Sequence, residues 1–549
     1  MPAKKQLTKN DLFDMLKLGG INQADYESQI REKYDTKEAD IIIESTKKKL
    51  EELKDAVEAK EEESIKTTSK RFYEDTKNKT VYESIFDENG WGQFISYSYS
   101  EEIGNKPRWN YTNKFPVGNT TIIPDNSAFN PIGKYSFNHA HVYDNIPQLS
   151  YYFQETKELL KKFIYLTDKQ FDLITTNILL SYQQHKVNSL GYVGILSLPE
   201  SGKTILGHLI SRMAYRTFFS TSKLNASNLY NFIGTDNEGD CTLVIDEFQE
   251  FSDEKNPDNR EVMSILRSGY QKGAVVPRIL DASSSSRIQV FYKTYNLKFL
   301  MGNYMPYDEA LKSRTIETYI VGMPKDWEGE DEINAEHEKL FNDLRVKLLL
   351  SRMAHYYEPF NDIDTQAYPI RGRVREIWGP LIKTVMNTCY ESNVKSIFNE
   401  WNEKYMLEKK AKLENKVAVV VSALRKDWCD IPFDSIWKGL CWLLHEPDKS
   451  ELESFDSEVL DRKVTKKGVG SILRSFGGIP KVSFQRYYNF NKEIMEIVRD
   501  KYLVTSEDVD NFYLELKASD IKELLKPASQ RENEATLSQL MSQAQSPAT

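Results

Sequence analysis

The chain has 549 residues, which predicts roughly three or four domains of about 150 residues each. Its net charge of −9 excludes a uniformly basic surface, so nucleic-acid binding would need local basic patches or a ring that gathers basic residues on its inner face. No apolar run approaches the roughly 18 residues of a membrane span. One of the longest, Val417–Val421, has only five residues and is predicted to be a buried helix segment.

Residues 1–70 are predicted to form a charged helical arm. A first helix would end at Gly19-Gly20. From Lys37 to Lys70, apolar residues recur among alternating Glu and Lys, which is typical of a solvated helix. The arm could bind a partner or be a mobile charged segment, and the sequence leaves both readings open.

Residues 71–150 are predicted to form a small β-rich module, because aromatic stretches alternate with turn signals such as Asn89-Gly90 and Gly104-Asn105. Four of its aromatic side chains could stack on nucleic-acid bases or could fill the core of the small sheet. They are Tyr97, Tyr99, Trp109 and Tyr111.

Residues 191–204 have the pattern of a phosphate-binding loop. An apolar, β-prone run (192–196) enters a short loop that ends in Gly202-Lys203-Thr204, and a helical pattern follows at once. Backbone N–H groups of such a loop cradle the phosphates of ATP, the lysine reaches the β/γ-phosphates and the hydroxyl holds Mg²⁺. Ser197 stands where the pattern has its first Gly. The predicted nucleotide-binding residues are Ser197, Leu198, Pro199, Glu200, Ser201, Gly202, Lys203, Thr204 and Asp246.

Asp246 and Glu247 come directly after an apolar strand, Cys241–Ile245. The 42 positions from Thr204 to Asp246 (246 − 204) accommodate one strand and two helices, as a parallel βαβα order requires. Asp246 would bind Mg²⁺ together with Thr204, and Glu247 would polarise the attacking water.

Two further strands, 274–280 and 287–292, are predicted to pair as a hairpin with a polar tip. The basic residues around it could follow a nucleic-acid backbone inside a ring or could pair with acidic neighbours. They are Lys272, Arg278, Arg287 and Lys293. A fourth core strand, 297–302, ends at Asn303, a polar residue that can orient the hydrolytic water, and Arg314 follows.

The order Gly202-Lys203-Thr204, Asp246-Glu247, Asn303 and Leu311-Lys-Ser-Arg314 resembles the core of the AAA+ ATPases. It looks closest to the hexameric helicases of the minichromosome-maintenance type and to related ATPases of plasmids and proviruses. The resemblance covers roughly residues 165–505. It implies that Asn303 is sensor 1, that Arg314 enters the site of a neighbouring subunit as an arginine finger, and that the hairpin lines a central channel.

The resemblance extends to two later segments. Residues 373–381 are similar to the lid helix that carries sensor 2, for which Arg373 is chosen over Arg371 and Arg375. Residues 464–478 resemble the C-terminal winged helix of the mobile-element ATPases. The residues themselves also fit a winged helix, in which a basic helix and a basic strand follow one another, although a protein-contact module fits as well. The basic residues of that helix are Lys466, Lys467 and Arg474.

The predicted fold is therefore a multidomain α/β protein with an αβα core built on a parallel sheet. The expected divisions are a helical arm at 1–70, a β-rich module at 71–150, an ATPase core at 151–325, a helical lid and connector at 326–430, a winged helix at 431–505, and a final helix with a disordered tail at 506–549.

The motifs favour an ATP- and Mg²⁺-dependent enzyme. The resemblance implies that it is a DNA helicase or translocase that forms a homo-oligomeric ring, most simply a hexamer, and that it acts in the replication of an element independent of the chromosome. The alternatives are an ATPase that remodels or loads partners without unwinding, and a winged-helix initiator. The scattered cysteines and the lack of a signal-peptide core predict a cytoplasmic protein. The resemblance to the mobile-element ATPases implies a prokaryotic, plasmid or viral system. A replication partner could bind the N-terminal arm.

Overall fold

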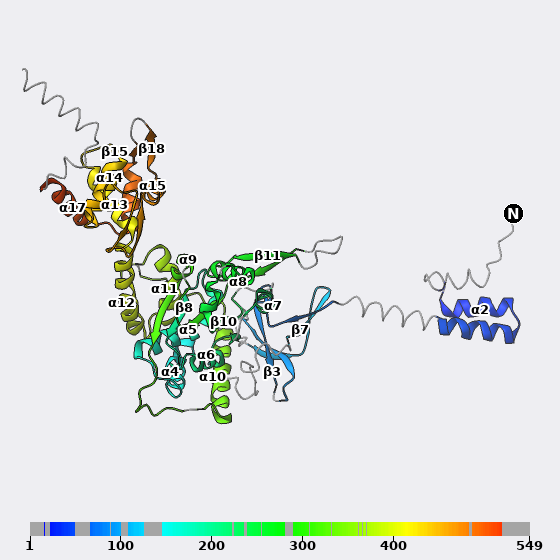
Figure 1. The fold of residues 1–549 in the computed structure, drawn as a ribbon. Coiled ribbons are helices and arrows are strands. Elements are labelled where there is room, and N and C mark those ends of the chain that lie inside the picture. The colour runs from blue at the N-terminus through cyan, green and yellow to red at the C-terminus, as the bar shows by residue number, and fades with distance from the viewer. Residues whose placement is uncertain are drawn as a thin grey trace, which may run out of the picture. The chain divides into compact units, whose positions relative to one another are not determined.

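The computed structural model describes most of the chain (Figure 1). The described residues are 16, 22–49, 66–87, 89–99, 108–125, 145–221, 224–234, 239–253, 255–279, 289–306, 308–330, 332–360, 362–364, 366–368, 370–482 and 486–518. Its contacts divide the chain into two compact units, Met1–Val394 and Lys395–Thr549. None of the described helices combines the length and the apolar character that crossing a membrane requires.

The N-terminal segment is a pair of helices. α2 (Gln23–Lys33) begins after Asn22, whose side chain accepts the N–H of Asp25, and a second helix covers residues 36–49. The two helices bury a small apolar cluster formed by Tyr26, Ile30, Ala39 and Ile43. The helical prediction for the arm is confirmed over these ranges, whereas the predicted helix at residues 8–20 lies almost entirely outside the described residues, as do residues 50–65.

The β-rich module consists of two sheets, with strand orders β1-β7-β6 and β2-β3-β4-β5. The strands are β1 (Lys66–Lys70), β2 (Phe72–Asp75), β3 (Thr80–Phe86), β4 (Gly92–Ser98), β5 (Arg108–Thr112), β6 (Phe115–Val117) and β7 (Thr120–Pro124). The assignment of residues 66–70 to the helical arm is wrong, because β1 pairs in parallel with β7 along its whole length. Tertiary pairing overrides the charge pattern there.

Two of the four predicted aromatic residues, Tyr97 and Tyr99, contact other protein groups closely. Tyr97 is 9% exposed, and its ring centroid lies 4.5 Å from that of Trp109. The hydroxyl of Tyr99 donates to the carbonyl of Met353 and accepts the N–H of Tyr356 at 2.7 Å. The core reading is therefore confirmed for Tyr97, whereas Tyr99, Trp109 and Tyr111 are half-buried and their base-stacking reading stays untested.

A parallel five-stranded sheet forms the centre of the first unit, in the order β14-β8-β13-β10-β9. Every pairing in it is parallel, which confirms the predicted α/β architecture. Its strands are β8 (Tyr192–Ser197), β9 (Thr217–Ser220), β10 (Thr242–Ile245), β13 (Leu297–Gly302) and β14 (Thr315–Ile320). The antiparallel pair β11 (Val275–Ile279) and β12 (Gln289–Lys293) is the predicted hairpin, while its tip at 280–288 lies outside the described residues.

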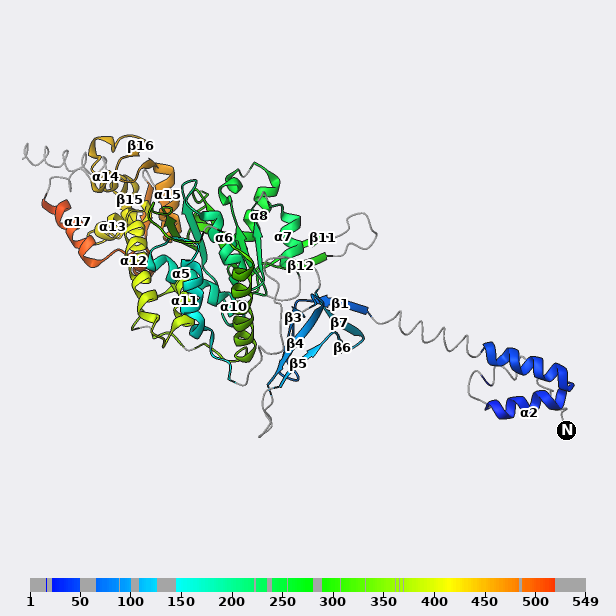
Figure 2. The same cartoon turned by 90° about the horizontal axis from the view of Figure 1, so that it is seen from below.

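Helices surround the central sheet. They are η2 (Leu149–Tyr152), α4 (Phe153–Lys161), α5 (Asp168–Ser181), η3 (Gln184–Lys186), α6 (Lys203–Met213), α7 (Ala226–Ile233), η4 (Phe248–Ser252), α8 (Pro257–Ser268), α9 (Glu309–Lys312), α10 (Ala335–Ala354) and α11 (Gly372–Val385). α10 packs on α6 and on β4 of the β-rich module, and α11 packs on α5. Figures 1 and 2 both show the β-rich strands beside α10.

A buried carboxylate joins the β-rich module to the core. Glu83 on β3 is 0% exposed and lies 2.6 Å from the guanidinium of Arg216, which precedes β9, and 3.0 Å from that of Arg352 on α10. The hydroxyl of Tyr215 donates to the same carboxylate at 2.9 Å. A charge removed from water is stable only when it is paired and hydrogen-bonded in this way.

The C-terminal unit has its own apolar core, to which residues from α13 through α17 contribute. Its elements are α13 (Leu413–Leu424), β15 (Asp430–Pro432), α14 (Phe433–Leu443), η5 (Pro447–Lys449), β16 (Ser454–Ser457), β17 (Arg462–Thr465), α15 (Lys466–Ser475), β18 (Ile479–Val482), β19 (Arg486–Asn489), α16 (Lys492–Tyr502) and α17 (Ser506–Ala518). α12 (Glu391–Lys410) runs across the division between the units. The order of a helix, a basic helix and a hairpin fits the predicted plan, and the winged-helix assignment stays a prediction.

Replacing Glu83 by Ala is expected to lower the free energy of unfolding by about 3–5 kcal/mol, because Arg216 and Arg352 would be left buried without their shared carboxylate. Denaturant unfolding followed by tryptophan fluorescence measures the change. Glu38→Ala on the exposed face of the N-terminal helix pair is the control, expected within about 0.5 kcal/mol of the unmodified chain. A Glu83 variant as stable as the control would contradict the role of this carboxylate.

Candidate nucleotide site

The loop between β8 and α6 has the backbone of an anion cradle. Gly202 directly precedes α6 with φ of 83°, and Glu200 also lies in the left-handed region with φ of 64°. A Cβ at position 202 would lie 3.2 Å from the Met323 Cε atom, so a glycine suits both the torsion and the space. The first N–H groups of α6 have no partner within the helix and are directed at this loop.

The strand order brings the remaining candidates to the same edge. β13 lies between β8 and β10, and all three run in parallel. Their carboxyl ends are therefore neighbours, where ligands bind in open α/β sheets. Lys203 follows β8, Asp246 follows β10 and Asn303 follows β13.

The side chains meet at this edge. Lys203 is buried, and its Nζ atom lies 3.2 Å from Asn303 Oδ1, 3.8 Å from Asp246 Oδ1 and 3.7 Å from Glu247 Oε1. The hydroxyl of Thr204 donates to Asp246 Oδ2 at 2.8 Å. Five of the predicted residues thus form one cluster: Lys203, Thr204, Asp246, Glu247 and Asn303.

The pair Thr204 and Asp246 fits a magnesium ion that is shared with phosphates. Adjacent ligands of octahedral Mg²⁺, each about 2.1 Å from the ion, are separated by about 3 Å, close to the 2.8 Å between these two oxygens. Mg²⁺ usually takes one or two protein carboxylates and completes its shell with water and substrate phosphates. The described residues contain no group of three or more His, Cys, Asp or Glu placed to hold a metal on their own.

Gln249 was not anticipated from the sequence, and it connects two of the candidates. Its side-chain Nε2 donates to Glu247 Oε2, while its Oε1 accepts the N–H of Asn303 at 3.0 Å. A Cβ at Gly302 would lie 2.3 Å from Gln249 Oε1, so the contact requires a glycine there. The only available signal was the position of Gln249 two residues after the Asp246-Glu247 pair.

Ser197 has an ordinary strand backbone. It is the last residue of β8, pairs with Ile320 and is absent from the non-glycine residues with positive φ in the described chain. Its hydroxyl and that of Ser201 are buried and have no hydrogen-bond partner among the described residues. Two unpartnered hydroxyls beside the loop suit a ligand that accepts hydrogen bonds, such as a phosphate.

Arg314 and Arg373 lie elsewhere. Arg314 precedes the amino end of β14, which runs parallel to β8 for six residues, so it is about 20 Å from the carboxyl edge of the sheet. Its guanidinium donates to the carbonyl of Arg267 and lies 4.2 Å from the ring centre of Tyr270. Arg373 stacks on the same ring at 4.6 Å and pairs with Glu376. Neither arginine contacts the phosphate loop of its own chain.

The basic residues near the hairpin have different surroundings. Arg278 lies 3.6 Å from Glu261 and stacks on Tyr230, which matches the reading that it pairs with an acidic neighbour. Lys272 and Lys293 line a cavity at the base of the hairpin. Arg287 lies outside the described residues.

In the C-terminal unit, Lys466 pairs with Glu453 at 3.1 Å at the start of α15. Lys467 and Arg474 are exposed on the same helix, while Val469 and Leu473 turn into the core. Of the three predicted basic residues, Lys467 and Arg474 are therefore exposed to solvent, where a partner could contact them.

Comparisons with known proteins give little guidance. No model of a protein family matches the chain, and no curated protein matches it. Among solved structures, the A form apo structure of the NrS-1 C-terminal region is 11% identical and covers 76% of this chain and 97% of its own, with a TM-score of 0.31. A second apo structure of that region is also 11% identical, and it covers 75% of this chain and 96% of its own, with a TM-score of 0.30.

A structure of JCV helicase with a bound acetamide compound is 13% identical and covers 48% of this chain and 62% of its own, with a TM-score of 0.21. Identities and TM-scores this low assign neither a family nor a function to the chain.

Ser197→Gly is expected to weaken binding of a fluorescent ATP analogue with Mg²⁺ by up to about tenfold, because the strand backbone there suits any residue and the change removes one hydroxyl that suits a phosphate. Gly202→Ala is expected to weaken the same binding by about tenfold or more, because left-handed torsion costs a non-glycine residue about 1–2 kcal/mol. Fluorescence anisotropy measures both. A tenfold gain in affinity for the Ser197 variant would mean that this serine impairs the site.

Proposed function

We propose that the chain is a Mg²⁺-dependent ATPase that works as a ring of identical subunits and moves along or unwinds DNA during replication of a mobile element. The observation that carries the ATPase part is the cluster of Lys203, Thr204, Asp246, Glu247 and Asn303 at the carboxyl edge of the sheet. The ring and the DNA substrate are supported by the order of motifs and by the position of Arg314.

Each residue has a separate task in this mechanism. The loop N–H groups and Lys203 would hold the β- and γ-phosphates and offset their negative charge. Glu247, which stays 43% exposed, would accept the proton of the attacking water, with Gln249 fixing its orientation. Asn303 would orient that water or the γ-phosphate. Mg²⁺, held by Thr204 and Asp246, would supply Lewis-acid stabilisation of the charge on the phosphates.

Arg314 is the reason for proposing a shared site. It lies at the sheet edge opposite its own phosphate loop, so it could contribute to hydrolysis only in the site of another copy. An arginine supplied in this way typically contributes about 10³–10⁵ in rate. Arg373, close to Arg314 around Tyr270, is proposed to act at the same interface.

The competing function is an ATPase that remodels partners without unwinding. A motor must couple hydrolysis to the displacement of a strand, whereas a remodelling ATPase need only hydrolyse. The two functions therefore differ in a single assay on forked DNA.

The experiment measures ATP hydrolysis and displacement of the labelled strand of a DNA fork in parallel. The unmodified chain is expected to hydrolyse ATP and to displace the strand. The Lys203→Ala variant alone and the Arg314→Ala variant alone are each expected to lose both activities. Mixing the two variants should restore part of the ATPase activity, because some interfaces would combine an intact loop with an intact finger. Lys312→Ala, an exposed neighbour of Arg314, is the control and should retain both activities.

Absence of rescue at every mixing ratio would contradict a shared site. Hydrolysis without strand displacement would favour the remodelling function.

A further inference from the structure

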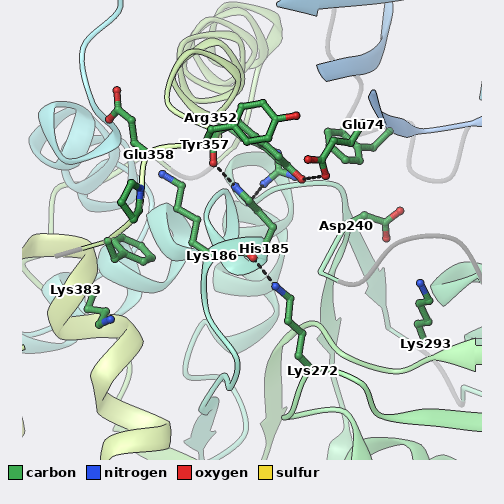
Figure 3. A pocket seen from close by; sticks show the side chains of 14 residues that line it. Glu74, His185, Lys186, Asp240, Lys272, Lys293, Arg352, Tyr357, Glu358 and Lys383 are labelled. Carbon is green, nitrogen blue, oxygen red and sulfur yellow. Dashed lines mark hydrogen bonds between the residues drawn. The ribbon is translucent and has the colours of Figure 1, made fainter. Parts of the chain in front are cut away.

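A cavity of about 530 Å³, shown in Figure 3, is lined by residues at the base of the β11–β12 hairpin and by none of residues 197–204. Lys186 of η3, Lys383 of α11, and Lys272 and Lys293 at the hairpin all line it. β2 of the β-rich module and the segment after α10 complete its walls. The volume lies within the roughly 300–1,000 Å³ range of ligand-binding pockets.

Three of these lysines form no direct ion pair with a carboxylate of the described residues. Lys186 Nζ donates to the carbonyl of His355 at 2.7 Å, and Lys272 Nζ donates to that of His185 at 2.6 Å. Lys383 forms no hydrogen bond or ion pair with any described residue. Carbonyl oxygens are neutral, so none of these three ammonium groups forms an ion pair within 4 Å of a carboxylate in the described structure, although Glu358 acts on Lys186 from a longer distance.

The acidic residues of the cavity are engaged with other groups. Glu74 accepts the hydroxyl of Tyr356 at 3.1 Å. Glu358 lies 2.8 Å from the His355 Nδ1 atom, and Asp240 lies 3.7 Å from the guanidinium of Arg71. Arg352, which also lines the cavity, is already paired with Glu83. The lysines are thus the groups left to bind a ligand.

The lowered pKa of Lys186 shows that its positive charge is poorly stabilised in the cavity. Burial lowers the pKa of Lys186 to about 8, with Arg352 acting in the same direction and Glu358 opposing them. An anion in the cavity would favour the charged ammonium and oppose that shift. His185, beside it, is held neutral because burial and Arg352 keep its pKa well below the usual value.

Aromatic rings border the same space. Phe360 lies 5.5 Å from Lys186 Nζ, and Tyr357 is 37% exposed. Rings beside ammonium groups are the combination that binds single-stranded nucleic acid, where lysines hold the backbone and rings stack on unpaired bases. A free inorganic anion would use the lysines alone.

We propose that this cavity binds single-stranded nucleic acid, with backbone phosphates on Lys186, Lys272 and Lys383 and an unstacked base against Phe360 or Tyr357. The proposal rests on the nucleic-acid part of the proposed function but needs no ATP hydrolysis. It identifies Lys186 and Lys383, two residues with no motif in the sequence, as strand contacts that lie outside the hairpin.

The test measures binding of a fluorescein-labelled oligothymidine by anisotropy, without nucleotide, over a range of salt concentrations. Lys383→Gln should weaken binding and reduce the slope of log K against log salt by about 0.7, as expected when one phosphate contact to a single strand is lost. Lys186→Gln with Lys383→Gln should reduce it by about 1.4. Lys383→Arg keeps the charge and should retain the slope.

The matched control, Lys114→Gln with Lys339→Gln, removes two exposed lysines of the same unit and should leave the slope unchanged. Free ATP or inorganic phosphate should compete only weakly with the oligomer. Equal slopes for Lys383→Gln and the control would overturn the proposal, as would full competition by millimolar phosphate.

The Lys203→Ala variant distinguishes the proposed ATPase activity from the proposed nucleic-acid binding by the cavity. It should lose ATP hydrolysis and keep oligomer binding. Failure of the unmodified chain to bind the oligomer would instead refute the nucleic-acid function itself, whatever the cavity variants do.

Discussion

The placement of β13 between β8 and β10 is the constraint on which the candidate site depends. Lys203, Asn303 and Asp246 follow three strands that are far apart in sequence and adjacent in the sheet. Because the strands are parallel, their carboxyl ends coincide and the three side chains converge. Glycine at 202 lets the loop turn, and glycine at 302 lets Gln249 approach. A change of strand order would leave the same residues without a common site.

The parallel sheet also separates the charged residues of the candidate site at its carboxyl edge from Arg314 at its amino edge. The phosphate loop lies at its carboxyl edge and Arg314 at its amino edge, so one copy of the chain holds the two halves of the proposed reaction apart. The β-rich module is joined to this core through Glu83, whose carboxylate is shared by Arg216 and Arg352. Arg352 reaches from that junction to the lysine-lined cavity, which places the cavity between module and core.

The parallel sheet, the turn from β8 into α6 and the Asp246-Glu247 strand end could be predicted because each is a local pattern of apolar residues, turn and polar tip. The hairpin was predicted for the same reason. β1 was missed, since its Lys and Thr residues become a strand only by pairing with β7. Gln249, Lys186 and Lys383 were missed because the contact of Gln249 with Asn303 and the cavity that both lysines line depend on neighbours far away in sequence. The arginine-finger, sensor 2 and winged-helix assignments came from resemblance and stay predictions.

The central claim is that the cluster at the carboxyl edge hydrolyses ATP with Glu247 as the base. The most direct measurement compares ATP binding and phosphate release by the unmodified chain and by Glu247→Gln with Mg²⁺ present. The variant should bind ATP with unchanged affinity and release phosphate at a rate lower by about 10² or more, the usual contribution of a general base. Phosphate release at the rate of the unmodified chain would contradict the account.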